Sequence, residues 1–469
     1  MSKAKTLGEL KESGYRSRPV KAEMRENLLK KLQQKENLFP GIIGYDNTVI
    51  PQIVHAILSQ HDMIFLGLRG QAKSRIIRML PDMLDDYIPI VQGSEINDDP
   101  FQPISKYART LIQEMGDNTP IQWISRDQRY NEKLATPDVT IADLIGDLDP
   151  IKAAKRGIEL SSEEVIHYGL LPRSNRSIFA INELPDLSPK IQVGLFNIMQ
   201  ERDVQIRGYS IRLPLDVCLV YSANPQDYTN RGRIVTPLKD RIGSEIRTHY
   251  PITRDEGMEI TDQEASIYNR DGRELVVPRF IKQVVEEIAR AARESKDIEQ
   301  ASGVSARFSI TCMENLISSA ERRAILNNEK VICPRASDFI HILPAMTGKM
   351  ELSYSGEERG AEMVSRRLIK EAVRIVFNEY FGHDDCQSTI AWFQEKHRTF
   401  VLDDSLSAQE VVDRAQEIKG LVGRVQAYLK QEPIRKPEVL ASGIEFMLEG
   451  LFAHKRLSKT ELQGQVAYG

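Results

Sequence analysis

Apolar positions along the first half of the chain follow two alternating patterns. Residues 50–60 (IPQIVHAILSQ) carry apolar side chains at helical spacing, whereas residues 63–68 (MIFLGL) form a short apolar run that reaches a glycine. The same kind of run returns at 176–182 (RSIFAIN) and at 216–224 (DVCLVYSAN), with helical segments between them. Buried apolar strands that alternate with helices predict a parallel β-sheet covered by helices on both faces.

The pattern changes after about residue 255, where the apolar strand runs disappear. Three later segments have the apolar stripe of amphipathic helices: 278–298, 309–326 and 362–381. The last part of the chain, 384–469, is also predicted to be rich in helix, with a proline-containing hinge at 431–438. The second half of the chain therefore predicts helical domains.

These changes divide the chain into four expected parts. Residues 1–35 are polar and highly charged, so we expect an N-terminal arm with a short helix. A stretch with proline and glycine at 39–44 breaks that pattern and begins the folded part of the α/β domain, 36–255. A helical lid domain, 256–350, and a helical C-terminal extension, 351–469, follow. The predicted fold class is α/β, with a parallel-sheet core and helices after it.

Composition narrows the possible classes of protein. With 469 residues, of which 41% are hydrophobic and 28% charged, the chain is typical of a globular protein with about two to four domains. Its net charge of −4 gives no general attraction to nucleic acid or anionic lipid. No apolar run approaches the roughly 20 residues that span a bilayer, the start lacks a secretory signal, and no two cysteines form a C-x-x-C pair. We therefore expect a cytoplasmic protein without a membrane span.

The main candidate for chemistry is a loop between a predicted strand and a predicted helix. It reads GLRGQAKS and matches the phosphate-binding pattern G-x-x-x-x-G-K-[ST], except that Ala72 replaces the second glycine. Backbone N–H groups of such a loop wrap phosphates, Lys73 would contact the β- and γ-phosphates, and Ser74 would ligate Mg²⁺. Alanine allows fewer backbone angles than glycine, so the change could reshape the loop. We expect ATP and Mg²⁺ to bind through Gly67, Gly70, Gln71, Ala72, Lys73 and Ser74, and through Ile42 and Ile43 upstream.

A second candidate lies at the end of an apolar run. This run ends in Asn182 and Glu183, where a Walker B strand has Asp followed by Glu. Glu183 fits the residue that polarises the attacking water. Asn182 keeps an acceptor oxygen for the metal site but lacks the negative charge that favours a divalent ion. Restoring the charge with Asn182→Asp is expected to tighten Mg²⁺ dependence and to speed turnover.

Three further residues complete the predicted catalytic set. Asn224 follows an apolar run and could orient the attacking water as sensor 1, although an Asn-Pro pair also begins ordinary turns. Arg241 could reach the γ-phosphate of a neighbouring subunit as an arginine finger, or it could pair with Asp240 on the surface. Arg307 begins a predicted helix in the second half and could report nucleotide state as sensor 2.

Taken together, these motifs resemble a known family. Residues 39–325 resemble the ATPase subunit of magnesium chelatase, within the group that includes the MoxR-type AAA+ ATPases. Outside the phosphate loop, the resemblance is carried by 146–149 (GDLD), 152–154 (KAA), 169–171 (GLL), 175–178 (NRSI), 201–212, 303–307 (GVSAR) and 319–323 (SAERR). MoxR-type loops often place alanine before the lysine, as Ala72 is placed here. Asn182 departs from the family pattern, and the chain beyond about 350 has no counterpart in the chelatase subunit.

The resemblance implies a P-loop AAA+ ATPase that works as a homo-oligomeric ring, such as a hexamer, with ATP between adjacent subunits. Hydrolysis would remodel a partner, for which the resemblance implies a von Willebrand A-domain protein. Two alternatives stay open: a true magnesium chelatase subunit that drives Mg insertion into protoporphyrin IX, and an ATP-binding scaffold with little turnover, which Asn182 would explain. A DNA-acting motor has little support, because the sequence has no separate helix-turn-helix signature and no basic stripe.

Overall fold

The computed structural model describes residues 3–157, 163–201, 213–225, 233–266, 272–462 and 465–469. The chain forms two compact units, Met1–His249 and Tyr250–Gly469. We expected the α/β part to end at residue 255, close to the observed division. Each unit has apolar cores of its own.

The first unit is built on a parallel sheet. Among the described residues this sheet has five strands in the order β4-β7-β8-β1-β9, and every neighbouring pair is parallel. The strands are β1 (Met63–Leu66), β4 (Tyr130–Leu134), β7 (Ser177–Asn182), β8 (Val217–Ala223) and β9 (Ser244–Arg247). The three apolar runs predicted as strands are thus β1, β7 and β8, which lie together in the middle of the sheet.

The other elements of the first unit are helices and two short antiparallel ribbons, β2–β3 and β5–β6. The helices are α1 (Leu7–Glu12), α2 (Val20–Gln34), α3 (Val49–Leu58), α4 (Lys73–Met79), α5 (Lys106–Met115), α6 (Ile141–Leu144), α7 (Pro150–Arg156), α8 (Leu170–Arg173), α9 (Pro189–Glu201) and α11 (Thr236–Arg241). The ribbon strands are β2 (Tyr87–Val91), β3 (Ile121–Ser125), β5 (Gly146–Leu148) and β6 (Ile166–Tyr168). Short 3₁₀ helices are η1 (Leu80–Met83), η2 (Gly116–Asn118), η3 (Arg126–Arg129), η4 (Glu163–Val165) and η5 (Leu184–Asp186).

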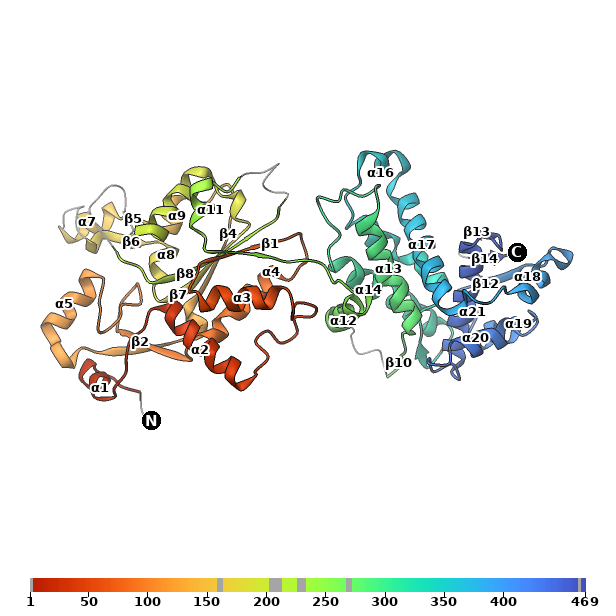
Figure 1. Cartoon of the computed structure of the whole chain (residues 1–469), viewed down its shortest axis with the longest axis horizontal. Coiled ribbons are helices and arrows are strands. Elements are labelled where there is room, and N and C mark those ends of the chain that lie inside the picture. Colours follow the sequence, from red (N-terminus) through yellow and green to blue (C-terminus); the bar gives the residue numbers. More distant parts are fainter. Residues whose placement is uncertain (1–2, 158–162, 202–212, 226–232, 267–271, 463–464) are drawn as a thin grey trace. The chain divides into compact units, whose positions relative to one another are not determined.

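Both faces of the central sheet are buried, as a parallel sheet requires. Successive residues of a strand point to opposite faces, so Phe179 and Ile181 belong to one apolar core while Ile178 and Ala180 belong to the other. Helices α2, α3 and α4 cover the second of these cores, and α9 and α11 contribute to the first. Figure 1 shows these two groups of helices on either side of the strands.

The N-terminal segment corrects one prediction, because residues 20–34 are not a separate arm. Helix α2 buries Val20, Met24 and Leu28 in the core beside α3. Its Glu23 accepts two hydrogen bonds of 2.7 Å from the buried guanidinium of Arg129. The apolar stripe of α2 is one residue wide, at every fourth position, so the surrounding charges hid it in the sequence.

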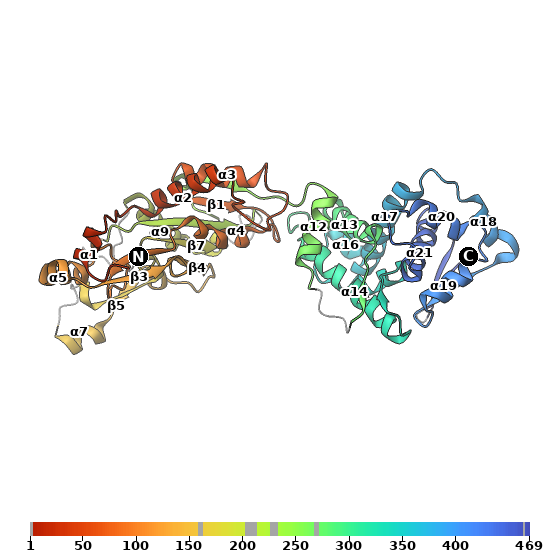
Figure 2. The same ribbon diagram turned by 90° about the horizontal axis from the view of Figure 1, so that it is seen from below.

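The second unit is mainly helical, and its main core includes residues from Phe280 to Tyr468. Its helices are α12 (Arg254–Glu264), α13 (Arg279–Glu294), α14 (Arg307–Leu326), α15 (Leu343–Thr347), α16 (Tyr354–Arg359), α17 (Ala361–Phe381), α18 (Gln387–Gln394), α19 (Ala408–Ala415), α20 (Leu421–Tyr428) and α21 (Pro437–Ala453), with the 3₁₀ helices η6 (Ala336–Ile342) and η7 (Glu395–His397). Helix α17 packs against both α13 and α21, as Figures 1 and 2 show. The expected lid (256–350) and extension (351–469) are therefore parts of one unit.

Short strands also occur in the second unit, where the sequence pattern predicted helices alone. Strands β10 (Glu274–Leu275) and β11 (Val331–Ile332) form a parallel pair. Near the chain end, β12 (Phe400–Asp403), β14 (Gln465–Tyr468) and β13 (Lys459–Leu462) form an antiparallel sheet in that order. These strands are only two to four residues long, so the apolar run in each is too short to stand out in the sequence.

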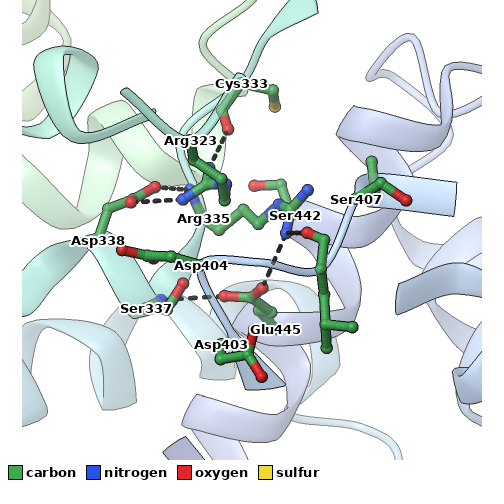
Figure 3. Close-up of polar contacts among 12 residues, drawn as sticks. Arg323, Cys333, Arg335, Ser337, Asp338, Asp403, Asp404, Ser407, Ser442 and Glu445 are labelled. Carbon is green, nitrogen blue, oxygen red and sulfur yellow. Dashed lines mark hydrogen bonds and ion pairs between the residues drawn. The ribbon is translucent and has the colours of Figure 1, made fainter. Parts of the chain in front are cut away.

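A buried charge network crosses the expected boundary at residue 350 (Figure 3). Arg323 of α14 donates hydrogen bonds to Asp338 of η6 and, at 2.8 Å, to the carbonyl of Cys333. Arg335 lies 3.8 Å from the carboxylate of Glu445 on α21 and donates to the carbonyl of Leu406 at 3.4 Å. The network connects α14 and η6 to α21, which explains in part why the second unit cannot be divided.

All four cysteines are unpaired and buried. Burial raises the pKa of Cys218 and of Cys312 to about 12, so these thiols are unreactive in their present surroundings. No helix within the described ranges has both the length and the apolar character needed to cross a membrane.

Candidate nucleotide-binding site

The predicted site residues of the first unit meet at one edge of the parallel sheet. Strand β1 is followed by Gly67, β7 by Glu183 and β8 by Asn224. Leu66 pairs with Ala223, and the N–H of Gly67 donates to the carbonyl of Ala223 at 3.2 Å. Because the strands are parallel, their carboxyl ends lie together, and this is where ligands bind in open α/β sheets.

The phosphate loop has a backbone that depends on small residues. A Cβ atom on Gly67 would lie 1.9 Å from Thr248 Oγ1 and 2.2 Å from Gln71 Oε1, so no larger residue fits there. Gly70 has a positive φ of 73°. Ala72 has φ 55° and ψ 11°, the left-handed region that glycine adopts more easily. The residue that departs from the motif therefore keeps the backbone conformation that favours a glycine.

Residues outside the motif hold the loop in place. Gln71 is buried, and its side-chain oxygen accepts a 2.8 Å hydrogen bond from Thr248 Oγ1 just after β9. The hydroxyl of Tyr45 lies 3.1 Å from the carbonyl of Gln71 and 2.7 Å from that of His249. Sequence reasoning missed Tyr45 and Thr248, because neither belongs to a recognisable pattern and both reach the loop only through the fold.

Ile42 and Ile43, which were predicted to bind the nucleotide, lie close in sequence to Tyr45. Ile42 is buried in the core that contains α2 and α3, and Ile43 is partly exposed. Tyr45, two residues after Ile43, contacts the loop as described above. The structure thus places the 42–45 stretch beside the loop, while nucleotide contact by Ile42 and Ile43 stays a prediction.

Lys73 and Ser74 begin helix α4 directly after the loop. The Lys73 side chain is buried, and its Nζ donates to the carbonyls of Gly67 and, at 3.0 Å, Leu68. Its ammonium group therefore lies along the inner side of the loop. Ser74 is exposed. These positions fit a lysine that contacts phosphate and a hydroxyl available to a hydrated cation.

Asn182 is held between two polar side chains on neighbouring strands. Its Nδ2 donates to Glu132 Oε1 of β4 at 2.5 Å, and its Oδ1 accepts from Ser222 Oγ of β8 at 3.0 Å. Glu132 also accepts hydrogen bonds of 2.8 and 2.9 Å from the guanidinium of Arg78 on α4. The bonds from Arg78 hold the pKa of Glu132 below its ordinary value, with further help from Tyr130 and Asn182, so the group is a carboxylate at neutral pH.

Glu183 and Asn224 occupy positions that suit water-activating residues. Glu183 has φ 55° and ψ 48°, an unusual conformation for a residue other than glycine. Its N–H donates to Ser222 Oγ at 3.2 Å, which fixes the chain at the end of β7. Asn224 is buried at the end of the adjacent strand β8. Strain of this kind is concentrated at functional sites, and the roles of both side chains stay predictions.

The two predicted arginines are placed differently. Arg241 is the last residue of α11, partly exposed, and its Nη1 donates to the carbonyl of Pro237 at 2.7 Å. Arg307 begins α14 in the second unit, where its N–H donates to Ser305 Oγ at 3.1 Å. Arginine-finger and sensor 2 roles for these residues stay predictions. Of residues 201–212, one of the stretches that carry the family resemblance, all but the first residue lie outside the described residues.

The groups at this edge fit Mg²⁺ with a nucleotide. The candidate donors are a hydroxyl, an amide oxygen and carboxylates, which are the oxygen ligands that Mg²⁺ prefers. Positive φ at Gly70 and Ala72 gives the loop a curved backbone, which lets successive N–H groups face an anion. Within the described ranges, no three His, Cys, Asp or Glu residues lie close enough to bind a metal ion by themselves.

Comparisons with known proteins agree with this assignment at the level of the fold. No family model matches the chain. An archaeal Lon protease of Thermococcus kodakarensis is 29% identical over 167 residues, and that of Methanothermobacter thermautotrophicus is 28% identical over the same length. In both cases the match covers 32% of this chain and 25% of the relative, so the chain spans about a quarter of the length of these curated relatives.

Solved structures are similar over larger parts of the chain but less closely. One is a complex of the subunits BchI and BchD of magnesium chelatase, 20% identical, with 68% of this chain and 98% of that chain covered and a TM-score of 0.37. Another is Hsp104 with casein, 10% identical, with 71% and 52% covered and a TM-score of 0.38. Because both scores lie below 0.5, we base the fold on the strand order and the loop geometry. The chain is similar to AAA+ ATPases, and its first unit has their P-loop α/β fold.

Proposed function

We propose that the chain is an ATP-hydrolysing AAA+ motor of the type found in the magnesium chelatase ATPase subunit and the MoxR group. It works in the cytoplasm as a homo-oligomeric ring, such as a hexamer. The observation that carries this proposal is the meeting of the phosphate loop, Glu183 and Asn224 at the carboxyl edge of β1, β7 and β8. The resemblance of residues 39–325 to these ATPases supports the same conclusion.

Each site residue has a proposed role. The loop binds ATP through its backbone N–H groups, and Lys73 balances the charge of the β- and γ-phosphates. Glu183 accepts a hydrogen bond from the attacking water and polarises it, while Asn224 orients that water from the next strand. Ser74 and Asn182 would hold Mg²⁺, which when bound neutralises charge on the phosphates.

The ring arrangement assigns work to residues away from the loop. Arg241 of one subunit reaches the γ-phosphate bound by its neighbour, and such fingers add about 10³–10⁵ to the rate of phosphoryl transfer. Arg307 contacts the nucleotide as sensor 2 and links nucleotide state to movement of the second unit. Both proposals require an assembled ring with ATP bound.

The test is steady-state ATP hydrolysis measured against protein concentration. If the site is shared between subunits, specific activity rises with concentration, and Lys73→Ala and Arg241→Ala each reduce it by about 10³-fold or more. Arg247→Ala is the matched control, because it removes another exposed arginine from the same unit and should leave the rate unchanged. Equal activity of Arg241→Ala and Arg247→Ala would reject the finger.

The proposed partner is a von Willebrand A-domain protein that the ring remodels. Such a partner should stimulate ATP hydrolysis when no porphyrin is present. If stimulation and metal insertion instead require protoporphyrin IX and the other chelatase subunits, the chain is a true magnesium chelatase subunit. The two outcomes differ in whether porphyrin is needed.

A scaffold is the second candidate, and Asn182 is the observation that favours it. Without a charge at position 182 the site could bind ATP and release it unchanged. This candidate predicts that ATP binding is lost in Lys73→Ala while the wild type shows no turnover above that variant. Turnover that depends on Lys73 would exclude the scaffold.

A further inference from the structure

Position 182 lacks the carboxylate of a Walker B strand, but a carboxylate lies in contact with it. Glu132 Oε1 is 2.5 Å from Asn182 Nδ2 across the β4–β7 pair. Leu134 is the partner of Asn182 in the strand register, so Glu132 lies two residues back on the same face of β4. A negative charge therefore lies beside position 182, although residue 182 itself is uncharged.

The same carboxylate is tied to the helix that begins with Lys73 and Ser74. Arg78 on α4 binds both carboxylate oxygens of Glu132, at 2.8 and 2.9 Å. Ser74 and Arg78 are four residues apart on α4 and so lie on the same side of that helix, one turn apart. Glu132 thus faces the side of α4 on which the predicted Mg²⁺ ligand Ser74 lies.

The orientation of the Asn182 amide follows from its two partners. Its Nδ2 donates to the Glu132 carboxylate, and its Oδ1 accepts the Ser222 hydroxyl. An aspartate at position 182 could not donate, and it would place a second negative charge against Glu132. Asparagine has the size of aspartate and can donate a hydrogen bond to a neighbouring carboxylate. In this pair Glu132 therefore supplies the acid, and Asn182 supplies the amide.

We propose that Glu132 is a positioning residue that supplies, from β4, the negative charge that attracts the nucleotide-bound divalent cation. The inference rests on the proposed function, because it concerns the Mg²⁺ that accompanies ATP. It also changes the expectation for Asn182→Asp. With Glu132 present, the added aspartate creates like-charge contact, so that variant gains no Mg²⁺ dependence and turns over no faster than the wild type.

The test measures ATP affinity of the full chain by calorimetry, in Mg²⁺ and in EDTA. The wild type should bind ATP more tightly in Mg²⁺. In Glu132→Gln the increase in ATP affinity that Mg²⁺ produces should fall by about tenfold or more. The affinity in EDTA should stay equal or rise, because a negative charge has been removed. The charge swap Glu132→Gln with Asn182→Asp should restore the gain, because the acid is moved to the neighbouring strand.

A control variant separates charge from support of the helix. Arg78→Ala breaks the same ion pair but leaves the Glu132 carboxylate, so it should keep the full Mg²⁺ gain. If Arg78→Ala loses the gain as Glu132→Gln does, the pair only holds α4 in place and the inference is wrong. An undiminished gain in Glu132→Gln would overturn it equally. A wild type that binds no ATP would reject the proposed function as well, whereas the other two outcomes leave ATP binding intact and reject the inference alone.

Discussion

Two arginine–carboxylate pairs, one in each unit, use the same chemistry in opposite surroundings. Arg78–Glu132 lies at the candidate site, where the arginine side chain is 63% exposed and the glutamate 21%. Arg323–Asp338 lies inside the second unit, where the exposed fractions are 3% and 1%. The first pair can exchange its partners for water or a ligand, and the second cannot.

The difference shows what each charge can do. Burial by itself lowers the pKa of Arg323, but the contact with Asp338 raises it above the ordinary value, so the arginine stays charged. For Arg335, burial and the nearby charge of Arg323 together lower the pKa. Buried charges of this kind hold segments of the chain to one another. The Glu132 carboxylate is instead partly exposed, and its arginine partner lies mostly in solvent.

The largest expected effect is on stability, from removal of Asp338. In Asp338→Ala the buried guanidinium of Arg323 loses its ion-pair partner, which should cost about 3–5 kcal/mol. Urea unfolding of the full chain, followed by circular dichroism, would measure the loss in the transition of the second unit.

The control for this variant is a neighbouring pair on the surface. Arg322 binds Asp404 at 2.6 Å, but its side chain is exposed, so Arg322→Ala should cost about 1 kcal/mol or less. Similar losses of unfolding free energy in the two variants would mean that burial does not determine how much an ion pair contributes to stability. Asp338→Asn, which keeps the shape of the side chain, should fall between them.

The next effect is on ligand binding. Gly67→Ala would push a Cβ into Thr248 and Gln71, so the loop must change shape. We expect ATP affinity to fall about 100-fold, which is about 2.7 kcal/mol of binding free energy. Titration with a fluorescent ATP analogue would measure it.

Gly423→Ala is the matched control for the loop variant. Position 423 lies in α20 of the second unit, and a Cβ there meets nothing within 4 Å. That variant should keep full ATP affinity and gain about 1 kcal/mol or less in stability from better helix propensity. If Gly67→Ala also kept its affinity, the loop would not need a glycine to approach phosphate.

A smaller effect on stability is expected from the Arg78–Glu132 pair. Because Arg78 is largely exposed and Glu132 partly so, Glu132→Gln should change the unfolding free energy by about 1 kcal/mol or less at neutral pH. The pKa of Glu132 is lowered in the folded chain, so its contribution is present at neutral pH and is lost as the pH falls through that lowered pKa. The difference between wild type and variant should therefore vanish in acid, as urea unfolding at several pH values would show.

The smallest effect concerns backbone strain at the loop. Ala72 has a left-handed backbone that costs an alanine about 1–2 kcal/mol, part of which a glycine would recover. Since glycine also makes the unfolded chain more flexible, Ala72→Gly should stabilise the first unit by about 0.5 kcal/mol. Ala72→Val should destabilise it, because a β-branched residue tolerates this backbone less. A loss of stability in Ala72→Gly would contradict the assigned conformation.

The sequence predicted the elements whose signal is local. Strands β1, β7 and β8 are buried on both faces, so each appears as a continuous apolar run, and the loop residues are contiguous. The long helices α13, α14 and α17 were predicted from their apolar stripes.

The missed features depend on contacts between distant segments. Glu132 meets Asn182 across two strands that are separated by fifty positions in the chain, and no motif joins them. Helix α2 has an apolar stripe too narrow to stand out among charges. The β12–β14–β13 sheet joins residues 400–403 to residues 459–468, and each of its strands is only four residues long. Patterns within a short window cannot report such pairings.

The shared core of the second unit also sets where the chain can be cut. A fragment that ended at residue 350 would retain Arg335 and lose Glu445, and it would expose the face of α13 that α17 covers. Recombinant dissection, domain exchange with a relative, or fusion of a reporter should therefore treat Tyr250–Gly469 as one indivisible module. A boundary chosen by analogy with a two-part lid and extension would yield an insoluble product.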